Sequence, residues 1–334
     1  MSTRRPTLVD VAGLAHCSPS AVSLVVSGKS RGRISPEVVT RVQSAVAELG
    51  YRPHHAARSL ATGRSGTIAV VVPDAANPYY AALVSGLAEE LAAEQAIILA
   101  VVGREEPLAA AISRAVDGDP DGLVVCSPAD TAALRGAPLC EFTVVLDAPG
   151  VRSSAAHVDV DVAAAGRLAS SHLRAQGHRR IGWLGPDRDS ATFLRRRDAA
   201  AESGRLDVAE VSALDPDAAA ERFRVAWPQW SARGVTAVIC ADDLLAYGVL
   251  LAAAELGITV PRDLALVGMG NLWNSQITSP ALTSVDLHAS QLGRNAARAL
   301  ARWRTSGTKP ARRQISVDLV ARASSAPVPR RSRV

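Results

Sequence analysis

The sequence predicts a small all-α head followed by a larger α/β body built on parallel sheets. Residues 1–52 contain three short helical patterns, and each begins with a residue that can cap a helix. From Thr67 onward, short β-rich runs alternate with helical patterns, which is typical of parallel sheets covered by helices on both faces. The charge is uneven: residues 1–66 carry nine bases and three acids, and the rest of the chain carries 28 bases and 29 acids. A basic head on a near-neutral body indicates a nucleic-acid-binding module joined to a second unit.

Composition narrows the class of protein further. The 334 residues fit two or three domains, and 48% hydrophobic with 21% charged residues is typical of a globular chain. No apolar run reaches the roughly 18–20 residues that span a bilayer, and the N-terminus leads into a polar, capped helix, so we expect a cytoplasmic protein with no membrane partner. The cysteines lie far apart, which favours free thiols over disulfides or a metal site, and no cofactor is expected. They are Cys17, Cys126, Cys140 and Cys240.

The first two helical patterns form a helix-turn-helix. Thr7 can cap the first helix, and Asp10 completes a capping box. Ser18 and Pro19 are a cap and a first helical residue for the second helix, which Gly28 ends. The residues expected to face the core are Leu8, Val11, Leu14, Val22, Val25 and Val26. The outer face of the second helix carries small residues, which suits close approach to a DNA major groove.

A third helix and a basic loop complete the head. Ser35 and Pro36 begin the helix and Gly50 ends it, with an inward stripe of Val38, Val42, Val46 and Leu49. The loop from Lys29 to Arg33 is suited to phosphates. Residues 54–61 are helix-prone but too short to be stable alone, and we interpret them as a helix that forms on DNA. Leu60 in such a helix is either a lone surface apolar residue or a wedge between base steps in the minor groove.

Four strings in the head resemble the lactose-repressor (LacI/GalR) family of bacterial transcription regulators. They are Thr7-Leu8-Val9-Asp10-Val11-Ala12, Ser18-Pro19-Ser20-Ala21-Val22-Ser23, Leu49-Gly50-Tyr51-Arg52-Pro53 and Ala57-Arg58-Ser59-Leu60. The resemblance implies a homodimer that binds a pseudo-palindromic operator in double-stranded DNA, with recognition helices in the major groove and hinge leucines in the minor groove. Together, the residues and the resemblance assign DNA contacts to Thr7, Ser18, Pro19, Ser20, Ser23, Leu24, Lys29, Arg33, Tyr51, His54, Ala57, Arg58 and Leu60.

Three residues of the head depart from the family pattern. Leu24 stands where the family commonly has an arginine, so contact with a thymine methyl replaces a bidentate bond to guanine. His16 occupies the usual glycine of the turn, where a left-handed backbone is expected. His54 replaces the hinge asparagine. These departures bear on the operator sequence more than on DNA binding itself.

The body is expected to contain seven strands and five helices. The expected strands are 67–72, 97–102, 122–126, 143–147, 180–184, 235–240 and 264–268. The expected helices are 78–94, 161–176, 216–232, 243–256 and 289–306. Ligands of parallel α/β folds bind beyond the carboxyl ends of the strands. Four of these ends carry polar or glycine-containing segments, namely Pro73-Asp74, Gly185-Pro186-Asp187, Ala241-Asp242-Asp243 and Gly268-Met269-Gly270-Asn271.

The body also resembles the effector domain of the same family, which is similar to a periplasmic binding protein with two α/β lobes crossed by three strands. The matching strings include Asn77-Pro78-Tyr79-Tyr80, Val260-Pro261-Arg262-Asp263 and Pro280-Ala281-Leu282-Thr283-Ser284-Val285. The resulting domains are a helix-turn-helix at 1–52, a hinge helix and linker at 53–65, an effector-binding and dimerisation domain at 66–325, and a disordered tail at 326–334. One lobe is expected at 66–158 and 287–310, and the other at 161–285 and 313–325.

The resemblance places a small-molecule effector, either sugar-like or another polar metabolite, between the lobes. Its expected contacts are Asn77, Tyr79, Tyr80, Thr192, Arg196, Asp242, Asn271 and Trp273. The two tyrosines are either flat ligand walls or ordinary core aromatics, and Arg196 is either a clamp or part of a solvated charge run. Trp273 is either a stacking wall or a packing residue.

The expected pocket also departs from the family. An aspartate usually stands where this chain has Gly270, Ala199-Ala200 replaces a glycine–aromatic pair, and Asp242 replaces an asparagine. We expect Asp243 to cap the helix that begins there.

A homodimeric, effector-controlled regulator, most simply a repressor, is therefore the leading hypothesis. A solute-binding protein without DNA function is the alternative, against which the basic head argues. We expect no enzyme activity, because neither the Asp242-Asp243 pair nor His172 and His178 belongs to a nucleophile–base or metal pattern. The tail has no heptad pattern, so a dimer is expected rather than a tetramer.

Overall fold

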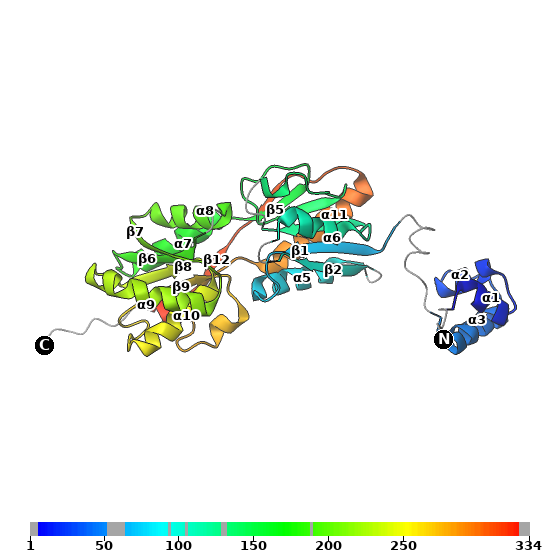
Figure 1. Ribbon diagram of the computed structural model, residues 1–334, viewed down its shortest axis with the longest axis horizontal. Helices are drawn as coiled ribbons and strands as arrows, with labels where there is room; N and C mark the ends of the chain where they lie inside the picture. Colours follow the sequence, from blue (N-terminus) through cyan, green and yellow to red (C-terminus); the bar gives the residue numbers. More distant parts are fainter. Residues whose placement is uncertain are drawn as a thin grey trace. The chain divides into compact units, whose positions relative to one another are not determined.

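The chain forms two compact units, a head (Met1–Gly66) and a body (Thr67–Val334). The computed structural model describes residues 6–51, 64–92, 95–103, 106–127, 132–187 and 190–326 (Figure 1). In the described ranges, no single helix is long and apolar enough to span a membrane, and only one sharply bent pair of helices, Leu8–Leu14 with Pro19–Val26, meets the length and composition that a span needs.

The head consists of α1 (Leu8–Leu14), α2 (Pro19–Val26) and α3 (Pro36–Leu49). The predicted capping box is confirmed, since the Asp10 amide donates to Thr7 Oγ1 and the Thr7 amide donates to Asp10 Oδ2. Ser18 caps α2 through the Ala21 amide, and Gly50 ends α3 in the left-handed conformation. His16 has a φ of 48°, so the left-handed turn expected there is present.

The core of the head is built on Val11, Val22 and Val42, all fully buried. Leu14 was expected to face this core, but 41% of it is exposed. It lies instead at a shallow surface hollow with Thr40, Arg41 and Ser44 of α3, while Ala15 joins the core in its place. The segment 52–63, which contains the expected hinge helix, lies outside the described residues.

The first lobe of the body is a parallel sheet in the order β11-β5-β4-β3-β1-β2. Its strands are β1 (Thr67–Val72), β2 (Ala96–Val101), β3 (Gly122–Cys126), β4 (Thr143–Leu146), β5 (Ala156–Val160) and β11 (Arg313–Ile315). Its helices are α5 (Pro78–Glu90), α6 (Leu108–Val116) and α11 (Ala289–Ser306), and Ala132–Leu134 form the short 3₁₀ helix η1.

The second lobe has the sheet order β12-β10-β9-β8-β6-β7, parallel except for β12 against β10. Its strands are β6 (Ile181–Pro186), β7 (Leu206–Val211), β8 (Ala237–Cys240), β9 (Ala265–Met269), β10 (Thr283–Asp286) and β12 (Asp318–Val320). Its helices are α7 (Val162–Ala175), α8 (Ala191–Ala201), α9 (Pro216–Ala232) and α10 (Asp243–Glu255). The short 3₁₀ helices η2 and η3 are Trp273–Gln276 and Ala323–Ser325.

The predicted fold class, a helical head with a two-lobed α/β body, is confirmed. One boundary inside the body differs: β11 pairs with β5, so the last crossing comes after Ile315 rather than before 313. Helix α5 ends at Glu90, before the expected 94, because Leu91 is extended (φ −73°, ψ 149°).

Close helix packing fixes the position of α5, whose first turn carries the expected ligand residues Asn77 and Tyr79. A Cβ on Gly293 of α11 would lie 1.9 Å from the carbonyl oxygen of Leu83, and one on Gly86 would lie 2.0 Å from that of Ser290. Ser290 Oγ also donates to the carbonyl of Ala82 at 3.1 Å. Only glycine allows the two helices to approach this closely.

Candidate functional site

A cavity of about 390 Å³ lies between the two lobes of the body, at the carboxyl ends of their strands. Its size is within the range typical of sites for small organic ligands. Of the eight residues expected to contact an effector, six line it: Asn77, Tyr79, Tyr80, Thr192, Arg196 and Asp242. Further lining residues that the sequence reasoning missed include Ser127, Asp147, Phe193 and Leu214.

The centre of the cavity is an acid–guanidinium pair that joins the lobes. Asp147, directly after β4, lies 3.9 Å (Oδ2) from Nη2 of Arg196 on α8, and each residue is only 3% exposed. Arg196 Nη1 donates to the carbonyl of Ala241 at 2.9 Å, and its guanidinium lies 5.1 Å from the ring centroid of Phe193. Thr192 Oγ1 donates to the backbone carbonyl of Asp147. Arg196 is therefore a buried clamp rather than part of a solvated charge run.

The loop that carries Asp147 is held by a second ion pair behind the cavity. Asp147 has a φ of 47°, in the left-handed region that side chains rarely adopt. The Ala148 amide donates to Asp159 Oδ1 at 2.8 Å, and Arg312 Nε donates to Asp159 Oδ2 at 2.6 Å. Arg312 also donates to the carbonyls of Ala148 and Val151. These bonds fix the strained turn that directs Asp147 to the cavity.

Three buried polar atoms of the cavity have no hydrogen-bond partner in the part of the chain that the structure describes. They are Tyr79 Oη, Asp147 Oδ1 and Arg196 Nε. Leaving a buried polar group unpaired costs about 1–3 kcal/mol. One atom accepts, one donates and the tyrosine hydroxyl does both, which is the hydrogen-bonding pattern that a ligand with several hydroxyl groups complements.

Asp242 and Asn77 form a second polar link between the lobes. Asp242 caps α10 by accepting from the Leu244 amide at 2.8 Å, and Asn77 Nδ2 donates to Asp242 Oδ2 at 3.3 Å. The expectation that Asp243 caps α10 is wrong, because its carboxylate points the other way. It accepts from the Leu272 amide, Ser275 Oγ and Ser284 Oγ at 2.7–2.8 Å.

Burial changes the acidity of these carboxyl groups. It raises the pKa of Asp147 and that of Asp242, and the positive charge of Arg196 opposes both shifts. It also raises the pKa of Asp243 to about 6, against the lowering effect of its three hydrogen bonds. Burial raises the pKa values of Tyr79 and Tyr80, so both hydroxyls remain protonated at neutral pH.

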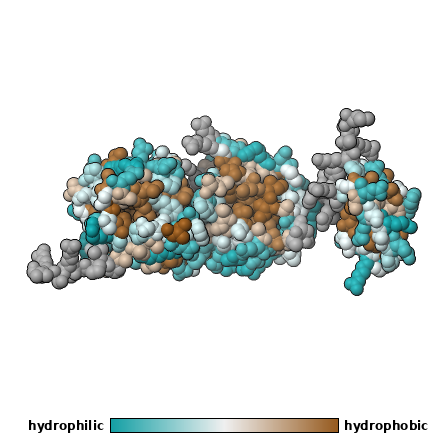
Figure 2. Space-filling view, turned by 90° about the horizontal axis from the view of Figure 1, so that it is seen from below, coloured by the Kyte–Doolittle hydropathy of each residue, from teal (hydrophilic) through white to brown (hydrophobic). Residues whose placement is uncertain are grey.

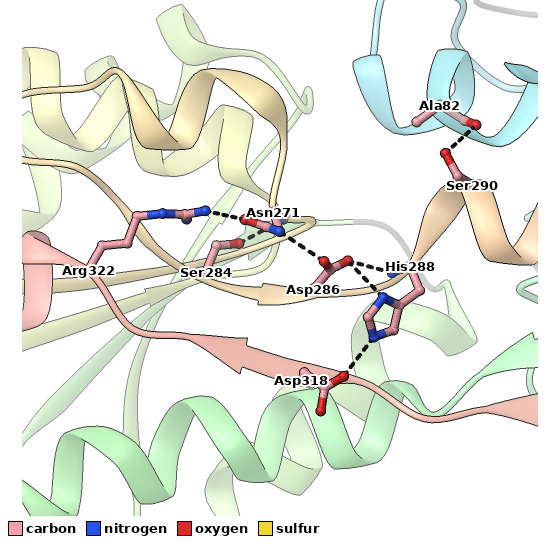
Figure 3. A network of polar contacts seen from close by, with 8 residues as sticks. All are labelled: Ala82, Asn271, Ser284, Asp286, His288, Ser290, Asp318 and Arg322. Atoms are coloured by element: carbon pink, nitrogen blue, oxygen red, sulfur yellow. Dashed lines mark hydrogen bonds and ion pairs between the residues drawn. The ribbon is translucent and has the colours of Figure 1, made fainter. Parts of the chain in front are cut away.

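The structure does not bring the last two expected residues, Asn271 and Trp273, to the cavity. Asn271 Nδ2 donates to Asp286 Oδ2 at 2.9 Å, and Asn271 Oδ1 accepts from Arg322 at 2.6 Å, as Figure 3 shows. Both polar atoms of the Asn271 side chain are therefore hydrogen-bonded to residues near the crossing between the lobes rather than directed to the cavity. Trp273 lies on η2 and is 66% exposed. Asp147 could have been predicted from the sequence, because it is an acidic residue at the carboxyl end of the expected strand 143–147, where ligands of parallel α/β folds bind.

On the head, the expected DNA contacts differ in exposure. Pro19, Ser20 and Ser23 are exposed on one face of α2, with Leu24 half-buried beside them. Lys29 and Arg33 are exposed in the loop that follows. Ser18 is exposed at the cap of α2, whereas Thr7 is half-buried and its hydroxyl bonds Asp10. Tyr51 is buried in the head core, so its ring serves packing. His54, Ala57, Arg58 and Leu60 lie outside the described residues.

Comparison with known proteins identifies both units. Residues 7–54 match the model of bacterial regulatory proteins of the lacI family, and residues 170–325 match a periplasmic binding protein-like domain. The chain is 31% identical to the HTH-type transcriptional regulator CelR of Thermobifida fusca, over 96% of this chain and 98% of the relative. It is 30% identical to the HTH-type transcriptional regulator GntR of Pseudomonas aeruginosa, over 90% of this chain and 89% of that relative.

Solved structures agree with these matches. The complex of the transcriptional regulator CelR with cellobiose aligns with a TM-score of 0.69 at 27% identity, covering 96% of this chain and all of the other. The lac repressor dimer bound to operator and the anti-inducer ONPF aligns with a TM-score of 0.78 at 23% identity, over 96% and 99%, and shares the fold.

The buried carboxyl of Asp243 makes a prediction about pH. Its pKa of about 6 in the folded chain exceeds the ordinary value near 3.9, so between these values the folded state binds more protons than the unfolded state. This contribution to stability is full below about pH 4 and is lost as the pH rises through 6. Asparagine does not titrate, so Asp243→Asn keeps the stability that the native sequence loses. The free energy of unfolding of the variant minus that of the native sequence should therefore rise by about 3 kcal/mol from pH 4 to pH 7.

Urea denaturation followed by tryptophan fluorescence measures this difference, because all five tryptophans belong to the body. Asp263→Asn is the control: the Arg262 side chain lowers the pKa of exposed Asp263 to about 2, so its effect should not change between pH 5 and 7. A constant difference between Asp243→Asn and the native sequence across this range would contradict the assignment.

Proposed function

The chain belongs to the lacI family of bacterial regulatory proteins and is a DNA-binding transcriptional regulator, and we propose that a small molecule in the Asp147–Arg196 cavity controls its affinity for an operator. The head reads the DNA and the body senses the ligand. The relatives named above are regulators, and we propose that this chain acts in the cytoplasm and catalyses no reaction. Repression is the simplest form of this control.

The observation that carries the proposal is the set of unpaired buried atoms on both lobes. Tyr79 and Asp147 belong to the first lobe and Arg196 to the second. A ligand that bonds all three contacts both lobes at once, so its binding free energy depends on their relative position. This dependence couples ligand binding to the movement of one lobe against the other. The CelR structure contains cellobiose, which supports a hydroxylated effector here.

DNA reading is assigned to the exposed face of α2 and the basic loop after it. Ser20 and Ser23 can bond base edges or phosphates, and Leu24 offers an apolar contact for a thymine methyl. Lys29 and Arg33 are placed to bind phosphates, which gives affinity without sequence preference. We assign minor-groove contacts to Ala57 and Leu60 on the family resemblance.

We propose that two copies pair through the first lobe, at β2. This strand forms the edge of its sheet, and Ile98, Leu99 and Val101 are exposed on it. Figure 2 shows apolar residues gathered on the face of the lobe that carries α5 and β2. An exposed, apolar edge strand is an association site unless it is covered. A second copy would cover it and present two heads to the two halves of an operator.

Arg196→Gln tests the effector site. Because the buried guanidinium provides a charged donor, its loss should weaken the binding of a cavity ligand by at least about tenfold. The measurement is the rise in melting temperature of the full-length chain with cellobiose, ribose, other sugars, nucleosides and purines. Arg195→Gln, which changes the exposed neighbour, is the matched control and should bind as the native sequence does. A ligand that stabilises native protein and Arg196→Gln equally would place the effector elsewhere.

Leu24→Arg tests the reading of bases by α2. Selection from random DNA should recover a thymine-containing half-site with the native protein and a guanine in its place with the variant, since arginine bonds guanine O6 and N7. Lys29→Ala is the comparison: it should weaken all sequences alike and reduce the salt dependence of binding by about one phosphate contact. Identical selected sequences for Leu24→Arg and the native protein would exclude Leu24 from base reading.

Leu99→Glu tests the association face. Placing a charge on the apolar edge strand should convert dimers to monomers at micromolar concentration, which sedimentation or light scattering measures. Val225→Glu puts the same charge on an exposed valine of α9 and should leave the dimer intact. If Leu99→Glu stays dimeric with native affinity, β2 is not the interface.

A further inference from the structure

Acidic groups outnumber basic groups in the cavity. Among its lining residues in the described part of the chain, the charged ones are Asp147, Asp242 and Arg196. Asp74 adds a further negative charge close enough to raise the pKa of Asp242.

The one guanidinium already lies beside a buried carboxyl group, since Nη2 is 3.9 Å from Asp147 Oδ2 and Nη1 is bonded to the carbonyl of Ala241. Its positive charge also opposes the rise that burial causes in the pKa of Asp242. The buried Nε has no hydrogen-bond partner among the described residues. A phosphate or carboxylate on a ligand would need this shared cation and would lie beside two carboxyl groups in a site of low dielectric. Like charges repel one another more strongly in such a site than in water.

A hydroxyl or amino group meets the opposite situation. Asp147 Oδ1 is a buried acceptor without a donor, and Arg196 Nε is a buried donor without an acceptor. The hydroxyl of Tyr79 can either donate or accept a hydrogen bond. A sugar hydroxyl can donate to the carboxylate and accept from the guanidinium, and a protonated amine can donate with the added attraction of opposite charge.

Within the effector function proposed above, we propose that Asp147 and Asp242 make the cavity selective for hydroxylated ligands that carry no negative charge, neutral sugars and amino sugars, and against sugar acids and sugar phosphates. Asp242 is the specificity-determining residue of the two. Asp242 is 8% exposed at the start of α10, and its carboxylate accepts a hydrogen bond from Asn77 of the other lobe. Asparagine at this position keeps an acceptor for the Leu244 amide but removes the charge.

The test uses the full-length chain and ligands that keep the sugar ring and differ mainly in charge. Glucose, galactose and mannose are each supplied as the free sugar, the amino sugar, the uronic acid and the 6-phosphate, ribose as the free sugar and the 5-phosphate, and cellobiose and maltose as the free sugar. Melting temperature finds the ligands that bind, and calorimetry measures their affinities at pH 7.5 and constant ionic strength. We expect binding in the neutral or amine classes only, with the matching acid and phosphate at least 100-fold weaker.

The Asp242→Asn variant separates charge from shape. The ratio of neutral to acid affinity should fall by at least tenfold in this variant, and because the ratio is measured within one protein, a lower melting temperature of the variant does not affect it. Asp263→Asn is the control. It removes an exposed carboxylate that does not line the cavity, so the ratio of neutral to acid affinity should not change.

An acid or phosphate that binds the native protein as tightly as its neutral parent would overturn the charge selectivity and leave the effector function intact. An unchanged ratio in Asp242→Asn would remove that residue from specificity. If no sugar class binds but a nucleoside or purine of the wider panel does, the selectivity for sugars is overturned and the effector function stands. The absence of binding by the whole wider panel would contradict both.

Discussion

The architecture of the body depends on one buried ion pair that is only partly satisfied. Asp147 and Arg196 come from different lobes, each is almost fully buried, and each keeps one polar atom without a partner. Breaking a buried pair leaves an uncompensated charge, so neither residue is free to vary alone. The left-handed turn at Asp147, the Arg312–Asp159 pair behind it and the bond from Arg196 to Ala241 all hold these two groups in place. Among the described residues, the mostly apolar cavity thus contains a few buried polar atoms that are incompletely paired.

The crossing between the lobes contains a second polar network that does not face the cavity. Asp286 bonds Asn271 on one side and the backbone amide of His288 on the other, and His288 Nε2 lies 2.8 Å from Asp318 Oδ2 (Figure 3). Two of the three crossing segments are thereby linked directly. The family pattern implies an acid that grips a ligand where this chain has Gly270, and the neighbouring Asn271 is engaged with the crossing. Among the described residues that line the cavity, the acidic ones are Asp147 and Asp242.

Much of the fold and most of the cavity follow from local sequence patterns. Continuous apolar runs such as Thr67–Val72 and capped helices such as Pro216–Ala232 were predicted to the residue because burial on both faces and clear caps leave little choice. Five strands were missed: β11 and β12 have only three residues each, and β5, β7 and β10 carry polar residues that hide the β pattern, namely His157, Asp159, Asp207, Glu210 and Asp286. Helices α6 and α8 were missed as well. Asp147 was missed and Asn271 and Trp273 misplaced because hydrogen bonds between distant segments decide where those side chains point. The hydrogen bond from Ser284 to Asp243 joins residues 41 positions apart, so no local sequence pattern predicts it.

The central claim, that the cavity and the operator are two coupled sites on one molecule, is tested most directly by measuring both affinities in both states. The operator affinity of the full-length protein is measured with and without a cavity ligand, and the affinity for that ligand is measured with and without operator DNA. Coupling requires the two ratios to be equal and different from one, at about 5- to 150-fold for typical regulators. A ligand that binds the cavity while both ratios equal one would contradict the account.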